Sequence, residues 1–224
     1  MIYAYILAPI IGYLFGSIPF AWFIVKLTTG KDVRKEGSGS VSTRNTVRTA
    51  GWGWAVITAS MDVTKGFIGA FLTLFVFFPE SAFISAGTYY SGSLLTALCG
   101  LGAFAGHCWM PWMKFKGGKG FAVLTGSLII INPWCIIVWW VTILIWALIT
   151  RYSGIAGILS TASVAITLTI FYFTDATAWN DWPVLLFGWG CTVLVIIRMI
   201  PDLIAIHKGE IKPWKGIKVS QWMK

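Results

Sequence analysis

The sequence predicts an all-α polytopic membrane protein with about seven transmembrane helices, and three observations predict it. The chain of 224 residues is 57% hydrophobic and only 11% charged, and it contains 14 tryptophans. Its mean hydropathy of +0.78 lies far above that of soluble domains. Its basic residues, finally, all fall on one side of the expected helices. We therefore expect residues 1–224 to form a single membrane domain.

Apolar runs long enough to cross about 30 Å of hydrocarbon mark the expected helices. They occupy residues 3–27, 52–78, 92–112, 135–150, 152–173 and 183–200. A shorter run at 121–131 lies between a glycine-rich loop and Asn132-Pro133, and counting it gives seven crossings. Because the first run has no basic leader and is too long for the core of a signal peptide, we expect it to remain as a membrane helix.

The distribution of charge predicts the orientation. With the N-terminus outside, all 17 lysines and arginines lie in inside segments. These are the loops near 28–51 and 113–120, the connection at Arg151, the tail 201–224, and the inside parts of the apolar runs that contain Lys26, Lys65 and Arg198. The outside connections are those near 79–91, 132–134 and 174–182, with Glu80, Asp175 and Asp181 but no lysine or arginine. The positive-inside rule therefore predicts an outside N-terminus and an inside C-terminus.

The same topology excludes a nucleic-acid-binding reading of the net charge of +9, because anionic lipid headgroups already account for an inside basic face. The tail places Lys208, Lys212, Lys215 and Lys218 among Trp214 and Trp222. This pattern fits an interfacial anchor or a solvated tail. The four cysteines show no CxxC spacing and lie in or beside apolar runs, so we expect packing residues rather than disulfides or a metal site.

Two inside loops contain candidate phosphate-binding residues. The loop Phe115-Lys116-Gly117-Gly118-Lys119-Gly120 combines backbone amides with two ammonium groups, but it lacks the spacing of a nucleotide P-loop. The loop from Gly37 to Thr49 is rich in glycine and hydroxyl residues and contains Arg44 and Arg48. Hydroxyl, amide and guanidinium groups all donate hydrogen bonds to phosphate. A plain inside connection and a flexible loop remain the alternatives.

Several ionisable residues lie within the apolar runs, and Asp62, Lys65 and His107 are candidate site residues among them. Asp62 and Lys65, at i and i+3, share one helical face and can pair, which lowers the cost of charge near lipid. His107 could act as a general base, a phosphate donor or a packing hydrogen bonder. The sequence has no HxxxxD dyad, since Trp112 stands five residues after His107, and it has neither a GxSxG elbow nor HExxH.

Several motifs together resemble the bacterial membrane glycerol-3-phosphate acyltransferase family that uses acyl phosphate as donor. They are Gly16-Ser17-Ile18-Pro19-Phe20 with Lys26, Gly37-Ser38-Gly39 with Asn45, Arg48-Thr49 and Gly51, Asp62-x-x-Lys65-Gly66, Gly106-His107 with Pro111, the 115–120 loop, and Thr150-Arg151-Tyr152. They follow one another in the family's order across most of the chain.

The resemblance implies transfer of a fatty acyl group from acyl phosphate to the 1-hydroxyl of glycerol 3-phosphate, giving lysophosphatidic acid, with no metal, no cofactor and no acyl-enzyme. Its expected catalytic residues are Ser38, Arg48, His107 and Lys119. Its expected phosphate-binding residues are Gly37, Gly39, Arg44, Asn45, Lys116, Gly117, Gly118, Gly120 and Asp202. Asp62, Lys65 and Arg151 would support the site.

The resemblance also implies partners and a location. The expected substrates are acyl phosphate and glycerol 3-phosphate, with the acyl chain in a groove between helices that opens to the inner leaflet. Membrane lipid and the soluble enzyme that makes acyl phosphate are further expected partners, and nucleic acid is not. The location would be the bacterial inner membrane, with the active face toward the cytosol.

The chain departs from the family pattern on what would be the acceptor side. An asparagine and a Pro/Ile-Gly-Ala-Thr stretch of the family pattern are replaced by Ser40, Val41, Ser42, Thr43 and Arg44. Gly154 stands where a serine is expected, Met199 where a histidine is expected, and Asp202 where an asparagine is expected. Two alternatives therefore stay open. One is a diverged member that uses another acceptor or binds lipid without turnover, and the other is a transporter or a structural subunit, although no internal repeat supports a transporter.

Overall fold

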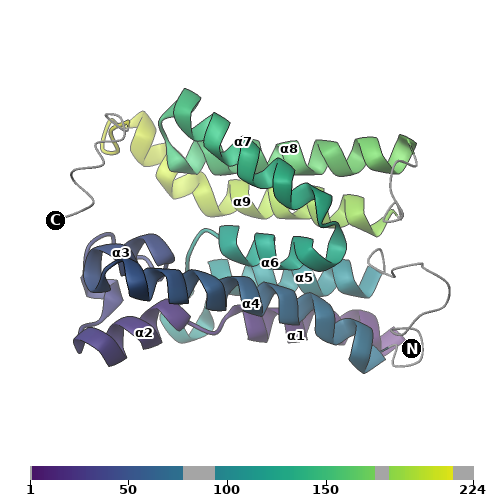
Figure 1. Cartoon of the computed structure of the whole chain (residues 1–224), viewed down its shortest axis with the longest axis horizontal. Coiled ribbons are helices and arrows are strands. Elements are labelled where there is room, and N and C mark those ends of the chain that lie inside the picture. The colour runs from purple at the N-terminus through teal and green to yellow at the C-terminus, as the bar shows by residue number, and fades with distance from the viewer. Residues whose placement is uncertain (1, 78–93, 175–181, 214–224) are drawn as a thin grey trace.

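The computed structural model describes residues 2–77, 94–174 and 182–213, and in these ranges the chain folds as a bundle of helices (Figure 1). In chain order they are α1 (Ile2–Gly16), α2 (Phe20–Thr29), the 3₁₀ turn η1 (Val33–Lys35), α3 (Thr43–Ala50), α4 (Trp52–Phe77), α5 (Leu94–Cys108), the 3₁₀ turn η3 (Pro111–Met113), α6 (Phe121–Ile131), α7 (Trp134–Thr150), α8 (Ser153–Thr174) and α9 (Pro183–His207). The described ranges contain no strand, and the all-α fold class is confirmed.

The apolar content of the helices agrees with a multi-pass membrane protein. Five described segments are long and apolar enough to span a bilayer: Tyr3–Thr29, Trp52–Leu72, Leu94–Met113, Ser153–Thr174 and Pro183–His207. The helices α6 and α7 are apolar but shorter, with 11 and 17 residues. At 1.5 Å per residue α6 measures only about 16 Å, less than the hydrocarbon thickness. All seven predicted apolar runs contain helix, while seven full crossings remain a prediction.

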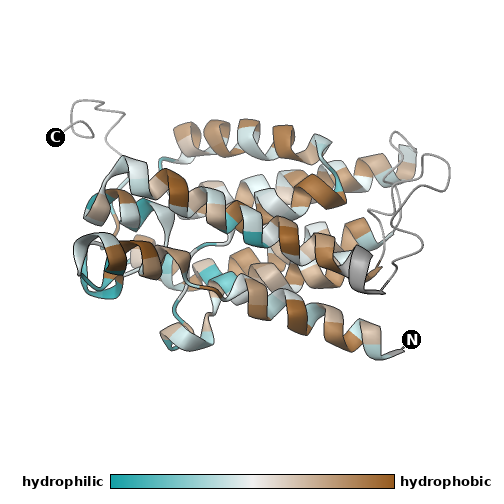
Figure 2. Cartoon of the chain, turned by 60° about the horizontal axis from the view of Figure 1, so that its bottom comes forward, coloured by the Kyte–Doolittle hydropathy of each residue, from teal (hydrophilic) through white to brown (hydrophobic). Residues whose placement is uncertain are grey.

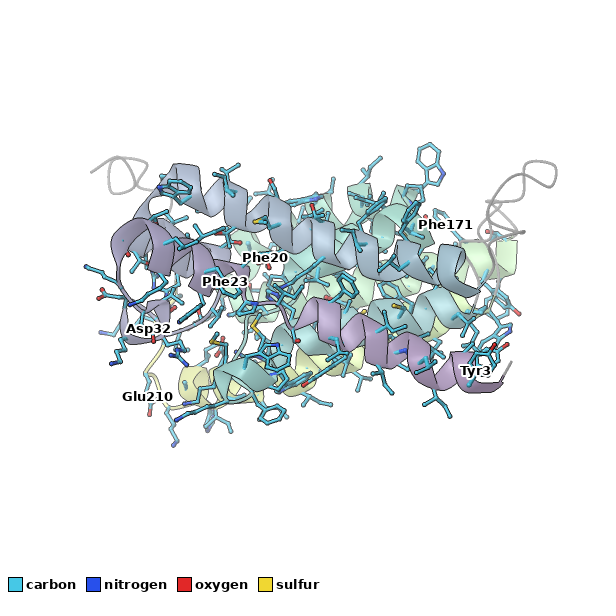
Figure 3. All side chains as sticks on the ribbon, turned by 90° about the horizontal axis from the view of Figure 1, so that it is seen from below. Tyr3, Phe20, Phe23, Asp32, Phe171 and Glu210 are labelled. Carbon is cyan, nitrogen blue, oxygen red and sulfur yellow. The ribbon has the colours of Figure 1, made fainter. Side chains whose placement is uncertain are left out.

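The predicted inside loops lie together at one end of the bundle, which we call the loop end (Figure 1). The α2–α3 segment, the start of α6, the turn between α7 and α8, and the end of α9 gather there, away from the N-terminus. Figure 2 shows apolar residues along the helices and hydrophilic residues concentrated at this end. In Figure 3, Asp32 and Glu210 lie at the loop end and Tyr3 lies at the opposite end.

The first predicted helix is broken between α1 and α2 at Pro19, which has no N–H to donate. The break leaves the carbonyl of Ile18 inside the bundle, where it accepts a hydrogen bond from Nζ of Lys65 at 3.0 Å. Lys65 also pairs with Oδ1 of Asp62 at 2.7 Å, and both side chains are buried. The predicted pairing of Asp62 with Lys65 is confirmed, and it satisfies backbone that lipid could not.

Glycines allow two helix pairs to approach closely. In the contact between α1 and α5, a Cβ at Gly16 would lie 2.0 Å from the carbonyl oxygen of Ala103. In the contact between α4 and α6, a Cβ at Gly66 would lie 2.2 Å from the carbonyl oxygen of Val123. Small residues at such interfaces let the two backbones pack directly against each other. Within a bilayer the hydrophobic effect does not drive helices together, because lipid is equally apolar, so close packing of this kind holds them together. These contacts hold α5 and α6, which carry the candidate site, in place.

The bundle has two groups of helices that share one core. Figure 1 shows α7, α8 and α9 side by side across from α1, α2, α4, α5 and α6. Phe104 of α5, Leu128 of α6, Trp139 of α7 and Phe187 of α9 meet in the buried cluster between the groups. The four cysteines are buried in helices with free thiols, which agrees with their predicted role in packing. The outer helix faces expose large apolar side chains, such as Phe173 at 77%, as expected for a lipid-facing surface.

The last helix is longer than the sequence predicted. We expected it to end at residue 200, before Pro201, but α9 continues through Pro201 to His207. Apolar residues at Leu203, Ile204 and Ile206 continue the helical pattern beyond the proline. Asp202 therefore lies on a helix rather than in a tail, and its position is fixed. The predicted interfacial anchor with Trp214 and Trp222 lies outside the described residues.

Candidate active site

Asn45 holds the hydroxyl-rich loop together. Its side chain is fully buried. Its Nδ2 donates to the carbonyl oxygens of Val33, Glu36 and Ser40 at 2.9, 3.0 and 3.1 Å, and its Oδ1 accepts from the amide of Ser38 at 3.0 Å. We expected Asn45 among the phosphate-binding residues. Because these four bonds occupy its amide, it supports the loop rather than presenting free donors to an anion.

Three serine hydroxyls line this loop. Oγ of Ser40 lies 2.9 Å from Oγ of Ser38 and 2.8 Å from Oγ of Ser42. Gly37 and Gly39 have φ values of 55° and 69°, which L side chains rarely adopt. A Cβ at Gly37 would lie 3.5 Å from Cδ of Arg48, so the exposed side chain of Arg48 passes directly beside the loop. Arg48 therefore lies beside Gly37, the residue that precedes Ser38 in the chain.

The glycine loop before α6 is bound to the end of α5. The amide of Gly117 donates to the carbonyl of Cys108, and the amide of Gly118 donates to the carbonyl of His107, both at 3.1 Å. We expected these two amides to face a phosphate. In the structure they satisfy carbonyls at the C-terminal end of α5, which otherwise lack partners. The backbone amides of Gly117 and Gly118 are therefore already used, and the side chain of Lys119, the next residue, remains as a donor for an anion.

Arg198 fixes the other side of the same loop. Its Nε donates to the carbonyl of Gly118 at 3.0 Å, and its Nη2 donates to the carbonyl of Gly117 at 2.9 Å. Sequence reasoning counted Arg198 only as an inside charge. The available signal was its place inside an apolar helix, because an ionisable residue in a membrane segment usually has a specific partner. Arg198 thereby ties α9 to the loop that carries Lys119.

His107 lies beneath the glycine loop. Only 4% of its surface is exposed, and a Cβ at Gly118 would lie 2.2 Å from its Nε2. Its Nδ1 lies 3.7 Å from Oδ1 of Asp62, which is beyond hydrogen-bonding distance. Of the three roles considered for His107, this burial favours packing and loop support over direct contact with a substrate.

Three positions that depart from the family pattern lie together, and one of them, Asp202, contacts Lys119. Nζ of Lys119 lies 2.8 Å from Oδ2 of Asp202, and the two side chains are 32% and 31% exposed. A Cβ at Gly154 would lie 3.3 Å from Sδ of Met199 and 3.7 Å from the same Oδ2. Met199 is fully buried in the core. The changes at 154, 199 and 202 therefore form one packed corner of α8 and α9.

Arg44, the added cation of the hydroxyl loop, reaches this corner. Its Nη1 donates to Oγ of Ser153 at 3.2 Å, one residue before Gly154. Partial burial and the neighbouring positive charge of Arg48 lower the pKa of Arg44, although a guanidinium stays protonated at neutral pH. This bond joins α3 to the start of α8, so the hydroxyl loop and the corner beside Lys119 belong to one region.

The remaining candidate residues lie at the loop end without joining these contacts directly. Lys116 and Arg151 are exposed. Gly120 is the N-cap of α6 with a φ of 83°, and a Cβ there would lie 2.4 Å from the ring of Phe104. This glycine lets the loop turn into α6 directly after Lys119.

An apolar hollow of about 520 Å³ lies nearby, between the break in the first helix and η3. It is lined by Leu14, Ile18, Pro19, Trp22, Phe23, Arg34, Trp112 and Met113. Arg34 forms an ion pair with Asp32 at 2.6 Å and holds the pKa of that carboxyl well below its usual value. None of the four residues expected to be catalytic lines this hollow. Figure 3 shows Phe23 and Asp32 on this side of the molecule.

Comparison with known proteins identifies relatives of this chain. The chain is similar to the glycerol-3-phosphate acyltransferase of Rhodopseudomonas palustris (strain BisB5), with 37% identity over 160 residues that cover 71% of this chain and 74% of the relative. It is also similar to glycerol-3-phosphate acyltransferase 2 of Moorella thermoacetica, with 30% identity over 209 residues, or 92% and 95% of the two chains.

A solved structure shares the fold. The crystal structure of PlsY (YgiH), an integral membrane glycerol 3-phosphate acyltransferase, in its glycerol 3-phosphate form, matches with a TM-score of 0.76 and 27% identity over 96% of this chain and 98% of the other. A family model described as glycerol-3-phosphate acyltransferase matches residues 6–209, which include the hydroxyl loop, the glycine loop and α9. The chain therefore belongs to the glycerol-3-phosphate acyltransferase family.

Proposed function

We propose that this protein transfers a fatty acyl group from acyl phosphate to the 1-hydroxyl of glycerol 3-phosphate. The hydroxyl oxygen attacks the carbonyl carbon of the mixed anhydride, the bond from that carbon to the phosphate oxygen breaks, and the hydroxyl proton leaves on the departing phosphate. The products are lysophosphatidic acid and inorganic phosphate. The family match over residues 6–209 supports this reaction, as do the glycerol 3-phosphate and lysophosphatidic acid forms of the PlsY structure.

One observation carries the proposal: cations from α3 and from the loop before α6 lie at the same end of the bundle. Arg44 is connected to the corner of α8 and α9 by its bond to Ser153, and Lys119 reaches that corner through Asp202. Two substrates that each carry a phosphate need such a surface, because their like charges repel each other. Guanidinium and ammonium groups offset that repulsion and hold the two phosphates in place.

For this reaction the protein mainly has to position its two substrates. Acyl phosphate has a good leaving group, so holding the hydroxyl against the carbonyl supplies most of the rate. In our proposal Arg48 and Lys119 bind phosphate oxygens, and Ser38 donates a hydroxyl beside Arg48. Arg44 and Lys116 add positive charge, and Gly37, Gly39 and Gly120 shape the two loops. His107, Asp62, Lys65 and Arg151 support the site from below and beside it.

The proposed location of the reaction rests on the predicted topology. We propose that the whole chain is one domain in the bacterial inner membrane, with the loop end in the cytosol and the N-terminus outside. Glycerol 3-phosphate and the soluble enzyme that makes acyl phosphate would then both reach the loop end directly. The basic surface would also raise the local concentration of both anionic substrates.

The proposal is tested by incubating the purified protein with acyl phosphate and glycerol 3-phosphate and measuring lysophosphatidic acid. We expect product from acyl phosphate and none from the matching acyl thioester, which lacks the phosphate that Arg48 and Lys119 would bind. Product from the thioester alone would reject the donor. Absence of product from both donors would reject the reaction.

A second candidate function keeps the donor and changes the acceptor. It is favoured by the corner formed by Gly154, Met199 and Asp202, which differs from the family pattern at all three positions. Offering glycerol, dihydroxyacetone phosphate and glycerol 3-phosphate with the same donor separates the two candidates. A clear preference for glycerol 3-phosphate supports the first.

A further inference from the structure

We infer that Asp202 is a built-in counter-anion that weakens the binding of substrate phosphate to Lys119 and thereby sets the apparent affinity of the site. This inference rests on the proposed function for the identity of the substrates. It concerns this chain in particular, because it depends on a carboxylate at a position where the family pattern has an asparagine.

Asp202 occupies a contact on Lys119 that a phosphate would otherwise make. An ammonium group is a compact point charge that makes the same kind of contact with a carboxylate as with a phosphate oxygen. At 2.8 Å, Oδ2 of Asp202 already occupies one such contact on Nζ of Lys119. A phosphate that binds Lys119 must displace this oxygen or share the ammonium with it. Since both side chains are about one-third exposed, an anion from solution can reach the pair.

Two residues near Asp202, Gly154 and Met199, have no polar side chain that could bind phosphate in its place. Gly154 has no side chain, and a Cβ there would approach Oδ2 of Asp202 to 3.7 Å. Met199, one turn earlier on α9, is fully buried and has no group that can donate to an anion. Neither position offers phosphate a side-chain donor. At this corner of α8 and α9, the polar group that meets Lys119 is therefore the carboxylate.

Two arginines near the ion pair keep the region positively charged. Arg198 bonds to the carbonyls of Gly117 and Gly118, directly before Lys119, and Arg44 bonds to Ser153, directly before Gly154. Both arginines thus bond to residues next in sequence to Lys119 and Gly154. Their positive charge still attracts phosphate to this region after Asp202 has neutralised Lys119. Asp202 therefore tunes the affinity without abolishing binding. A weaker hold also speeds the release of inorganic phosphate, a product of the proposed reaction.

The test compares Asp202→Asn, which keeps the shape and removes the charge, with Glu210→Gln, which removes a charge from the exposed residue just beyond α9. Kinetic measurements give KM for glycerol 3-phosphate, KM for acyl phosphate and the inhibition constant of inorganic phosphate. The constant that changes shows whether Lys119 binds the phosphate of the acceptor, of the donor or of the product. We expect Asp202→Asn to lower at least one of the three by about two- to fivefold, as for removal of a partly exposed ion-pair partner. Glu210→Gln should change none of them.

A binding measurement separates this inference from the proposed function. Inorganic phosphate should protect the detergent-purified protein against thermal unfolding at a lower concentration in Asp202→Asn than in the wild type, with chloride at equal ionic strength as the control. This result stands even if no lysophosphatidic acid forms. Asp202→Ser serves as the second neutral variant if Asp202→Asn folds poorly.

A double variant shows whether the effect acts through Lys119. In a Lys119→Gln background, adding Asp202→Asn should leave phosphate affinity unchanged, because the cation that the carboxylate neutralises is gone. Equal or weaker phosphate affinity in both neutral single variants would overturn the inference. An equal gain in the Lys119→Gln background would overturn it as well.

Discussion

Lys119 and Arg48 are the two single residues on which the proposed catalysis depends most. Each would make a charge-assisted hydrogen bond to phosphate, worth about 1.5–3 kcal/mol. We predict that Lys119→Ala and Arg48→Ala each lower the rate of acyl transfer by about 10- to 100-fold. The measurement is lysophosphatidic acid formed per amount of folded protein. Lys35→Ala is the matched control, since it removes an exposed cation of the same end from η1. Wild-type rates in both site variants would rule out the site as drawn.

Gly118 tests whether His107 supports the loop. A methyl group at this glycine would meet Nε2 of His107 at 2.2 Å, and overpacking of this kind costs about 1–3 kcal/mol. We predict that Gly118→Ala lowers both the unfolding temperature in detergent and the rate of transfer. Gly53→Ala is the control, because a Cβ there meets nothing within 4 Å. It should be neutral or slightly stabilising, as for glycine replacement within a helix. A harmless Gly118→Ala would contradict the packing of His107 beneath the loop.

Among the elements, the break between α1 and α2 depends on a buried ion pair in α4. Removing one member of such a pair typically costs about 3–5 kcal/mol, because the other charge stays buried alone. We predict that Lys65→Met greatly reduces the yield of folded protein. Asp62→Asn combined with Lys65→Met should recover much of it, although Ile18 still lacks its donor. Size-exclusion profiles and thermal unfolding measure both. Equal damage in the single and double variants would show that Lys65 matters only for the carbonyl of Ile18.

The helices themselves were largely predictable from sequence, and their ends were not. Apolar runs between charged or glycine-rich segments correctly predicted α4, α5, α7, α8 and the short α6. The end of α9 was misplaced because Pro201 read as a stop, whereas packing and the apolar residues beyond it keep the helix intact. The i and i+3 spacing of Asp62 and Lys65 predicted their pairing. It could not show that the pair also satisfies Ile18, because that contact joins residues far apart in the chain.

The candidate site was predictable as a set of loops more than as a set of contacts. Sequence reasoning selected Lys119 and the hydroxyl loop, and the structure places both at the loop end. It assigned the amides of Gly117 and Gly118 to phosphate, whereas these amides bond to the end of α5. It missed Arg198, whose partners are carbonyls of that same loop. Local composition shows which groups can donate, but the tertiary fold decides which donors are already used.

For the whole molecule, the orientation in the membrane is the prediction that most affects function. The four native cysteines are buried, so a thiol reagent that cannot cross membranes should label only an introduced cysteine. Lys35 lies exposed at the loop end, and Trp182 lies 54% exposed at the start of α9, toward the opposite end. We predict that Lys35→Cys reacts only in inside-out vesicles and Trp182→Cys only in right-side-out ones. The reverse pattern would place the site outside, away from both substrates.

The central claim is that the loop end brings two phosphate-bearing substrates together, so that the acyl group passes from one to the other. The most direct measurement follows both products at once, lysophosphatidic acid and inorganic phosphate, from purified protein given acyl phosphate with and without glycerol 3-phosphate. The account predicts equimolar formation of the two products, with little phosphate release when the acceptor is absent. Rapid release of phosphate without lysophosphatidic acid would show that water, rather than a bound acceptor, receives the acyl group, and it would contradict the claim.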